Sequence, residues 1–365
     1  MNQKEFFGFG SISHLVEILR LEKSQKVFLV TGKASYESCG AKKAIESRLS
    51  VPFFRFSDFS PNPKFEEIQK GYEEFRQGDY DFIMGVGGGS AIDVAKAIKM
   101  FNYDESGKKV PLVAIPTTAG SGSEATHFIV YYRGKEKQSQ GSLNLTLPDY
   151  AIIDPEFILK LPSKISAETG LDALSQAVES FWSVNSTEES RVYASQAIRL
   201  LNENLKVSVN NPNMQSKQAV MRAANLAGKA INLSKTTACH AVAYPITSYF
   251  GVAHGHAAAL TLGEMFIFNS FVTNEDCSDS RGADYVKDII KELAKLFGFL
   301  TAEETNKYLS SLMIDLGLET RLSNLGINRE GIETIIKNGF TPERVKNNPR
   351  VLREEDLRAM LTRIY

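Results

Sequence analysis

The first 160 residues alternate short apolar runs with amphipathic stretches, and this alternation constrains the fold more than any other feature of the chain. Residues 27–31, 82–86, 112–115 and 151–153 have the length and composition of buried strands. Between them, residues 65–77 and 91–100 repeat apolar side chains at spacings of three and four, as helices do. Strands that alternate with helices are typical of a parallel sheet, so we predict an α/β domain over residues 1–160.

The pattern changes in the second half of the chain. From residue 166 onward β-branched runs are few, and we predict helices at residues 167–181, 188–204, 218–232, 284–297 and 303–316. Prolines cluster near residues 155–165. We therefore place a domain boundary there and predict an all-helical second domain over residues 161–365.

Composition excludes several classes of partner. Lys and Arg total 42 and Asp and Glu 43, and a net charge of −1 argues against a broad cationic face for nucleic acid or anionic lipid. The apolar run at residues 257–268 is interrupted by Gly263 and Glu264 and is too short to span a bilayer. Cys39, Cys239 and Cys277 form no disulfide framework, and no signal peptide is predicted, so we expect a cytoplasmic protein.

A glycine-rich loop stands between a predicted strand and a predicted helix, and it consists of Gly87, Gly88, Gly89 and Ser90. Glycines let the backbone approach an anion closely, and the helix start offers unpaired N–H groups. The next predicted strand is followed by a hydroxyl-rich loop that contains Thr117, Thr118 and Ser121. Ligands of open α/β sheets bind at this edge, so we predict a dinucleotide there; two ordinary tight turns are the alternative.

The second half contains polar groups that could bind a metal or move a proton. His240, His254 and His256 fall within 17 residues of a chain with only five histidines. Asp172 and Gln176 are four residues apart and share one face of a predicted helix. An Asp, two His and a further oxygen donor would suit a divalent transition metal. Core histidines with satisfied hydrogen bonds are the alternative.

These motifs, in this order, resemble the iron-containing alcohol dehydrogenase family. The resemblance rests on residues 87–90 with Asp93 and Lys96, on residues 116–124, 154–155 and 170–173, and on His240 with residues 254–255. It implies a dinucleotide-binding domain, a helical domain in the dehydroquinate synthase-like architecture, and a metal, Fe²⁺ or Zn²⁺, in the cleft between them. It also implies NAD(P)H, a small aldehyde or alcohol substrate and a homodimer or larger homo-oligomer.

Carried over by position, the family's metal ligands fall on Asp172, Gln176, His240 and His254. Gln176 departs from the pattern, in which a histidine is usual, and an amide oxygen is a weaker donor than imidazole. Tyr244 also stands where many members carry a histidine. The resemblance implies hydride transfer between a nicotinamide and an aldehyde, with His256 or Tyr244 moving the proton and with Asp93 at the cofactor loop.

Residues 172–183 and 227–237 look like the branch that reduces phosphonoacetaldehyde to 2-hydroxyethylphosphonate. Lys229 and Lys235 would then recognise the doubly anionic phosphonate, unless both are solvated surface residues. Three alternatives remain open: a generic short-chain alcohol dehydrogenase, a metal-dependent sugar-phosphate lyase of the dehydroquinate synthase type, and a non-catalytic dinucleotide-binding protein that lost its metal because of Gln176.

The residues after the first predicted strand bear on the choice of cofactor. Many NAD-using members of the family place an Asp directly after this strand, where its charge disfavours a 2′-phosphate. This chain has Gly32 there, followed by Lys33 and Ser35. The carboxylate that would repel the 2′-phosphate is thus missing, and the Lys33 ammonium is available to bind it. We therefore expect NADPH to be favoured over NADH. The alternative is that Lys33 points into solvent and NADH is used.

Overall fold

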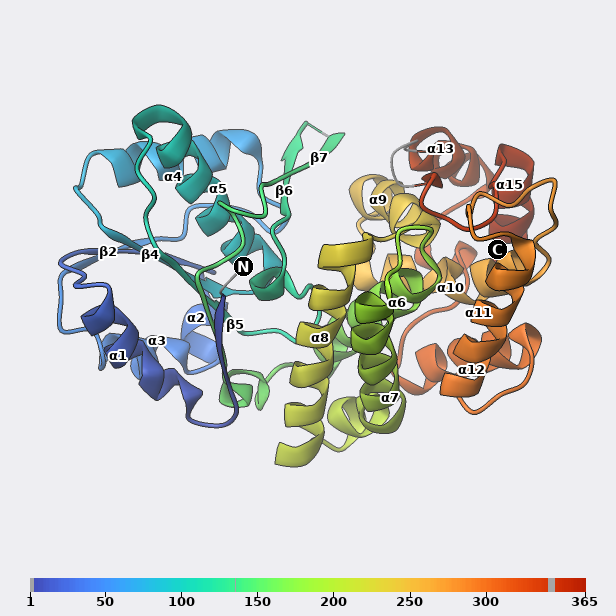
Figure 1. The fold of residues 1–365 in the computed structure, drawn as a ribbon, viewed down its shortest axis with the longest axis horizontal. Helices are drawn as coiled ribbons and strands as arrows, with labels where there is room; N and C mark the ends of the chain where they lie inside the picture. The colour runs from blue at the N-terminus through green and yellow to red at the C-terminus, as the bar shows by residue number, and fades with distance from the viewer. Residues whose placement is uncertain (1–2, 135, 341–344) are drawn as a thin grey trace. The chain divides into compact units, whose positions relative to one another are not determined.

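A computed structural model describes residues 3–134, 136–340 and 345–365. The chain forms two compact units, residues 1–161 and residues 162–365 (Figure 1). The first unit is built on a parallel sheet with helices, and the second consists of helices in all of its described residues that form regular structure. The predicted fold class, an α/β part followed by an all-helical part, is therefore confirmed.

The main sheet has six strands in the order β1-β8-β5-β4-β2-β3, and neighbouring strands are parallel. The strands are β1 (Lys4–Phe7), β2 (Val27–Thr31), β3 (Phe53–Phe56), β4 (Phe82–Gly87), β5 (Leu112–Pro116) and β8 (Tyr150–Ile153). The helices of this unit are α1 (His14–Leu21), α2 (Ser35–Ser38), α3 (Ala41–Glu46), α4 (Phe65–Arg76) and α5 (Gly89–Ser106). The four strands predicted from the sequence are the four central strands of this sheet.

Helices cover both faces of the sheet because side chains along each strand alternate between two cores. Val27 and Leu29 pack in one core with residues of α1 and α3. Phe28 and Val30 pack in the other core with residues of α4 and α5. Figure 1 shows α1 and α3 below the sheet and α4 and α5 above it. Strands that are buried on both faces are apolar throughout, and this is the pattern that predicted them.

Two edge strands and a hairpin lack that pattern. β1 and β3 form the two edges of the sheet and are partly exposed. β6 (Ile129–Arg133) and β7 (Glu136–Gln140) form a separate antiparallel hairpin. Every residue of β7 is polar or charged, and its sequence Glu-Lys-Gln-Ser-Gln carries no strand signal.

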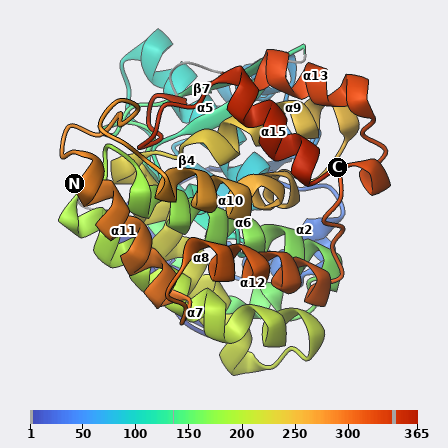
Figure 2. The ribbon, with the colours of Figure 1, turned by 90° about the vertical axis from the view of Figure 1, so that its right-hand side faces the viewer.

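The second unit is built around α6, which packs against α7, α8 and α10. Its helices are α6 (Ser163–Trp182), α7 (Glu188–Asn210), α8 (Met214–Ser234), α9 (Ala238–Phe250), α10 (His254–Ser270), α11 (Ala283–Leu296), α12 (Ala302–Asp315), α13 (Arg329–Gly339) and α15 (Glu354–Arg363). In Figure 2 this unit faces the viewer, with α11, α12, α13 and α15 in front. Every residue of α6 from Gly170 to Trp182 is buried, so each polar side chain in that stretch needs a partner inside the protein.

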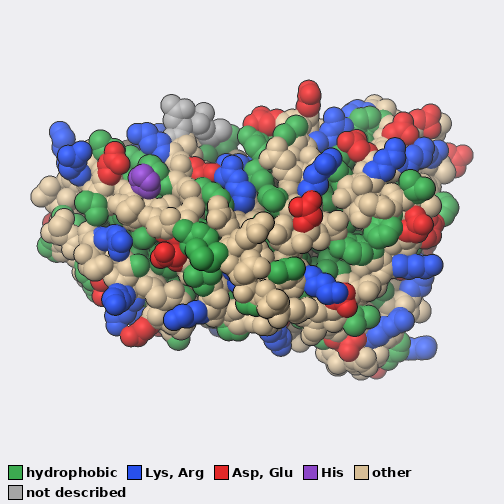
Figure 3. Space-filling model, turned by 90° about the horizontal axis from the view of Figure 1, so that it is seen from below, with side chains coloured by type: hydrophobic (Ala, Val, Ile, Leu, Met, Phe, Trp, Pro, Cys, Tyr) green, Lys and Arg blue, Asp and Glu red, His purple; other side chains and the backbone are tan. Residues whose placement is uncertain are grey.

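The described surface carries charges of both signs. In Figure 3, Lys and Arg side chains are interspersed with Asp and Glu over the face drawn. None of the helices in the described ranges is long and apolar enough to cross a membrane.

Asp154 generates a prediction about the stability of the first unit. Its carboxylate is fully buried and accepts hydrogen bonds from the backbone N–H groups of Gly10 (3.3 Å), Ile12 (3.0 Å) and Glu156 (3.1 Å). Because each unsatisfied buried N–H costs about 1–3 kcal/mol, Asp154→Ala should lower the free energy of unfolding by about 2–4 kcal/mol in urea titrations. Asp154→Asn keeps an acceptor and should lose less. A loss for Asp154→Ala no larger than that for the exposed Glu156→Ala would contradict the prediction.

Candidate functional site

The loops predicted to bind a dinucleotide lie at the carboxyl ends of three neighbouring central strands. β2, β4 and β5 are neighbours in parallel register, with Thr31 opposite Val86 and Gly87 opposite Pro116. The loops that follow these strands contain residues 32–35, 87–90 and 117–121. The backbone N–H of Thr117 donates to the carbonyl oxygen of Gly87 at 2.9 Å and joins two of the loops.

The three glycines of the second loop shape the space in front of α5. Gly87 has φ 151°, a conformation that side chains rarely adopt. Gly88 is the N-cap of α5, and a Cβ built on it would lie 3.3 Å from Thr118 Oγ1. A Cβ on Gly89 would lie only 2.8 Å from Ser121 Oγ. No side chain therefore covers the backbone N–H groups at the start of α5, and a pyrophosphate could approach them closely.

Asp93 and Lys96 belong to α5, and both side chains bind other parts of the same unit. Asp93 accepts hydrogen bonds from Ser123 Oγ (2.5 Å) and from the N–H of Val130 (3.0 Å). Lys96 is completely buried and donates to Ser123 Oγ (2.8 Å) and to the carbonyl oxygen of Phe128 (3.1 Å). Burial raises the pKa of Asp93 and lowers the pKa of Lys96 to about 8, although each charge opposes the shift of the other. Asp93 therefore supports the loop after β5.

A basic residue that sequence reasoning missed joins the loop after β2. Arg55, on β3, donates to Thr31 Oγ1 (2.7 Å) and to the carbonyl oxygens of Gly32 (2.9 Å) and Lys33 (2.8 Å). Lys33 Nζ lies 3.6 Å from a carboxylate oxygen of Asp58, and both of these side chains are exposed. Arg55 carries no signal in the sequence because nothing local shows that β3 lies beside β2.

Asp172, His240 and His254 come together in the second unit from α6, α9 and α10. One donor atom from each lies within 4.8 Å of the others, and Asp172 and His240 are buried while His254 is partly exposed. Gly255 makes this approach possible, because a Cβ on it would lie 2.6 Å from Asp172 Cβ and 2.0 Å from the carbonyl oxygen of Glu168. Only a glycine lets α10 begin against α6. Three of the four predicted ligands thus meet in space.

Three other predicted site residues, on α6, α9 and α10, have different contacts. Gln176 Nε2 donates to Asp172 Oδ2 at 3.3 Å. The ring of Tyr244 stacks on the ring of His254, with centroids 5.2 Å apart and planes inclined by 5°. Nε2 of His256 donates to the carbonyl oxygen of Glu319 at 2.6 Å, and burial lowers the pKa of this imidazole. Gln176 and Tyr244 therefore touch candidate ligands, whereas His256 is held by the backbone.

Glu179 is part of this site and was not singled out from the sequence. Its carboxylate is completely buried, and Oε2 is hydrogen-bonded to His240 Nδ1. Oε1 accepts from the N–H of Cys239 at 2.8 Å. A signal was available, because Glu179 follows Asp172 by seven residues and two helical turns return it to the same face of α6.

The electrostatics of the cluster favour a cation. Burial lowers the pKa of His240, but the carboxylates of Glu179 and Asp172 outweigh it and raise the pKa to about 9. His240 Nε2 is buried, lies 3.4 Å from Asp172 Oδ1 and makes no hydrogen bond within the described part of the chain. Two buried carboxylates need positive charge nearby, and a carboxylate with two imidazoles is a donor set for a divalent transition metal. The residues present therefore fit the metal that the sequence predicts.

The two predicted substrate lysines differ in their surroundings. Lys229 lies on α8 and is partly buried, whereas Lys235 lies just beyond the helix, is exposed and has φ 64°. Arg222, Asn225 and Asn232 share one face of α8 with Lys229, and Asn225 is completely buried. This face, residues 222, 225, 229 and 232, is the polar stripe of α8.

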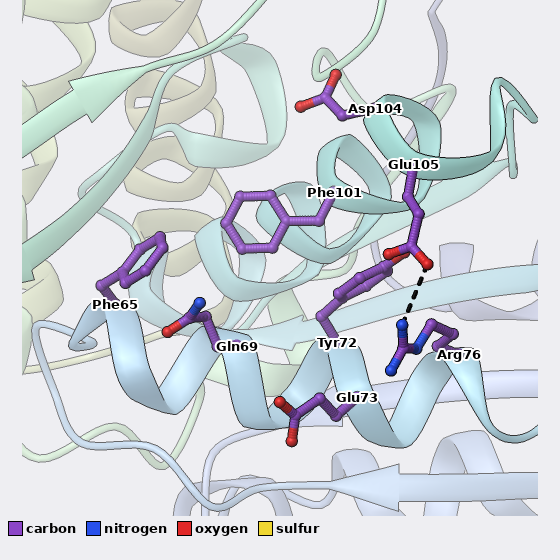
Figure 4. Close-up of a pocket in the computed structure, with 8 residues that line it drawn as sticks. All are labelled: Phe65, Gln69, Tyr72, Glu73, Arg76, Phe101, Asp104 and Glu105. Atoms are coloured by element: carbon purple, nitrogen blue, oxygen red, sulfur yellow. Dashed lines mark hydrogen bonds and ion pairs between the residues drawn. The ribbon is translucent and has the colours of Figure 1, made fainter.

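A groove of about 500 Å³ lies elsewhere in the first unit, along α4 and α5 (Figure 4). Phe65, Tyr72 and Phe101 line it, and Arg76 pairs with Glu105 at 3.1 Å on its rim. Phe101 lies about 18 Å along α5 from Gly89, so the groove is separate from the glycine-rich loop.

A glycine-rich loop on a parallel sheet, followed by a helical unit with an Asp-His-His cluster, is the arrangement expected for the dehydrogenase family that the sequence resembles. Two family models match the chain. "Iron-containing alcohol dehydrogenase" matches residues 2–155, and "Fe-containing alcohol dehydrogenase family, C-terminal" matches residues 166–365. The chain belongs to the iron-containing alcohol dehydrogenase family and is an oxidoreductase.

Individual relatives cover most of the chain. The phosphonoacetaldehyde reductase of Streptomyces viridochromogenes is 32% identical over 77% of this chain and 75% of its own length. Long-chain-alcohol dehydrogenase 1 of Geobacillus thermodenitrificans is 30% identical over 97% and 93%. The crystal structure of sulfoacetaldehyde reductase from Bifidobacterium kashiwanohense in complex with NAD⁺ is 30% identical, with a TM-score of 0.87 over 99% and 96%. These names favour a dehydrogenase over the lyase and non-catalytic alternatives.

Proposed function

We propose that this enzyme uses NAD(P)H to reduce a small aldehyde with an anionic head group to a primary alcohol, and that phosphonoacetaldehyde is the substrate. The observation that carries the proposal is the meeting of Asp172, His240 and His254 in one cluster that is largely buried. The names of two relatives support the substrate class, because phosphonoacetaldehyde and sulfoacetaldehyde are both two-carbon aldehydes with a charged oxyanion group.

In this proposal Asp172, His240 and His254 hold a divalent metal, Fe²⁺ or Zn²⁺, and Gln176 orients Asp172 or completes the ligand set. When bound, the metal supplies Lewis acidity for the carbonyl oxygen and the reduced nicotinamide supplies the hydride. Tyr244 is the better proton donor of the two predicted residues, because it stacks on His254 while His256 is bound to a backbone carbonyl. The phenol O–H of Tyr244 would deliver its proton to the alkoxide oxygen of the product.

The loops at the carboxyl ends of β2, β4 and β5 would bind the dinucleotide. The N–H groups at the start of α5, after Gly87, Gly88, Gly89 and Ser90, would hold the pyrophosphate. Thr117, Thr118 and Ser121 would line the nicotinamide side, and the loop after β2 would meet the adenosine ribose. Arg55 would keep that loop in one conformation through its bonds to two carbonyl oxygens.

The head group would be recognised at the polar stripe of α8. Of the two predicted lysines, partly buried Lys229 has the better surroundings, because a cation shielded from water binds an anion more strongly than an exposed one. An enzyme for uncharged alcohols is the second candidate, and the identity to the long-chain-alcohol dehydrogenase favours it.

Replacement of the histidine ligands tests the metal assignment. His240→Ala and His254→Ala should each remove most of the bound metal and the reductase activity together, because each deletes one of three clustered donors. Gln176→His should tighten metal binding, since imidazole is the better donor for these ions. Metal content and affinity are measured anaerobically with Fe²⁺ and Zn²⁺, with exposed His14→Ala as the matched control. Full metal occupancy in both ligand variants would refute the assignment.

Substrate charge is tested at α8. Lys229→Ala should raise the KM for phosphonoacetaldehyde by about 10–100-fold, because a charge-assisted hydrogen bond contributes about 1.5–3 kcal/mol, and should leave the KM for acetaldehyde within about twofold. Lys235→Ala should have a smaller effect, as its side chain is exposed. Exposed Lys291→Ala on α11 is the control. Equal changes for both aldehydes would show that Lys229 is only structural, and faster reduction of uncharged aldehydes by the wild type would favour the second candidate.

Cofactor choice is tested at the loop after β2. We expect a higher kcat/KM with NADPH than with NADH, and Lys33→Ala should lower the NADPH value by about tenfold, or ~1.4 kcal/mol. Gly32→Asp should shift the preference toward NADH, although its Cβ would lie 2.3 Å from Ser35 Oγ and the Ser35 side chain must rotate. Lys43→Ala, an exposed lysine of α3, is the control. A wild type that prefers NADH, or an unchanged ratio in Gly32→Asp, would overturn the expectation.

A further inference from the structure

We propose that Glu179 is a positioning residue that fixes the tautomer of His240 and thereby sets the metal affinity of the cluster. The inference rests on the assignment of His240 as a metal ligand made above. It assigns a specific function to a buried carboxylate that touches neither substrate nor cofactor in the proposed reaction.

One oxygen of Glu179 is locked by the start of α9. Oε1 accepts hydrogen bonds from Thr237 Oγ1 (2.7 Å) and from the N–H groups of Thr237 (3.2 Å), Cys239 (2.8 Å) and His240 (3.3 Å). Thr237 is the N-cap residue of α9 but makes no capping bond with its own side chain, so Glu179 caps this helix from α6. Trp182 Nε1 donates to Thr237 Oγ1 at 2.9 Å and orients that hydroxyl.

The other oxygen then determines where His240 carries its proton. Oε2 is bonded to His240 Nδ1, and a carboxylate oxygen acts as a hydrogen-bond acceptor. Nδ1 must therefore donate, which leaves the lone pair of the neutral ring on Nε2. Nε2 is the atom that lies 3.4 Å from Asp172 Oδ1, within the candidate donor set.

The variant Glu179→Gln reverses this one hydrogen bond with little change in shape. The amide oxygen can still accept from the backbone N–H groups of α9, while the amide NH₂ is turned toward Nδ1 of His240. Nδ1 must then accept, and the proton of the neutral ring moves to Nε2, where it blocks metal coordination. Glu179→Asp keeps a carboxylate acceptor and should retain the Nδ1–H tautomer.

Two readouts test the proposal. Competition with a chelator should show that Glu179→Gln binds Zn²⁺ about 10–100-fold more weakly than the wild type, the effect typical of partners that orient a ligand. Imidazole ¹⁵N NMR of the metal-free protein at a pH where His240 is neutral should show the shift from the Nδ1–H to the Nε2–H tautomer. Glu179→Asp should recover the wild-type tautomer and most of the affinity.

Ser180→Ala is the matched control for a loss of stability alone. Ser180 neighbours Glu179 on α6, is completely buried and accepts a hydrogen bond from Ser234 Oγ at 2.7 Å. This variant should unfold at a lower urea concentration and bind Zn²⁺ like the wild type. A Glu179→Gln protein with wild-type affinity, or with its proton still on Nδ1, would overturn the proposal. If the wild type itself binds no Zn²⁺ or Fe²⁺, the metal assignment fails instead, and the tautomer readout still reports on Glu179.

Discussion

Two carboxylates buried on one helix constrain the architecture of the helical unit. Asp172 and Glu179 lie two turns apart on α6, and burying a charge is costly unless partners surround it. The partners come from neighbouring helices: the start of α9 supplies N–H groups to Glu179, and α10 begins beside Asp172 because Gly255 has no side chain. The positions of α9 and α10 are thus constrained by the buried carboxylates of α6. The same contacts place His240 and His254 beside them.

In the first unit, the candidate binding loop lies at the carboxyl end of β4 and contains no buried charged side chain. Gly87, Gly88 and Gly89 leave the N-terminus of α5 bare, and the Thr118 and Ser121 side chains stand where a Cβ would collide. The charged side chains lie further along the helix, where Asp93 and Lys96 form hydrogen bonds that connect α5 to the segment after β5. Anion binding here would depend on backbone dipoles held in place by a buried ion pair.

The strands and helices that could be predicted from sequence are those with a local signal. β2, β4, β5 and β8 are buried on both faces and therefore apolar throughout, and α6, α7 and α8 are long and periodic. β1 is four residues long and is defined by pairing with β8, far away in the sequence, so no local pattern reveals it. At the site, the sequence points to Asp172, His240 and His254 as chemistry-bearing residues. Arg55 acts through contacts between strands, which no local pattern reports. Periodicity places Glu179 on the same face of α6 as Asp172, but it does not reveal the contact of Glu179 with His240 on α9.

The charges of the cluster also explain why recognition of an anionic substrate would need a separate cation. A divalent metal would neutralise Asp172 and Glu179 together, with neutral imidazoles on His240 and His254, so the cluster as a whole would offer no net charge to a phosphonate or sulfonate. Gln176 does not change this net charge, because its amide side chain is neutral. The attraction must then come from a neighbouring element. α8 packs directly on α6 and carries Arg222 and Lys229 in its polar stripe, which is the reason for placing head-group recognition there in the proposed function.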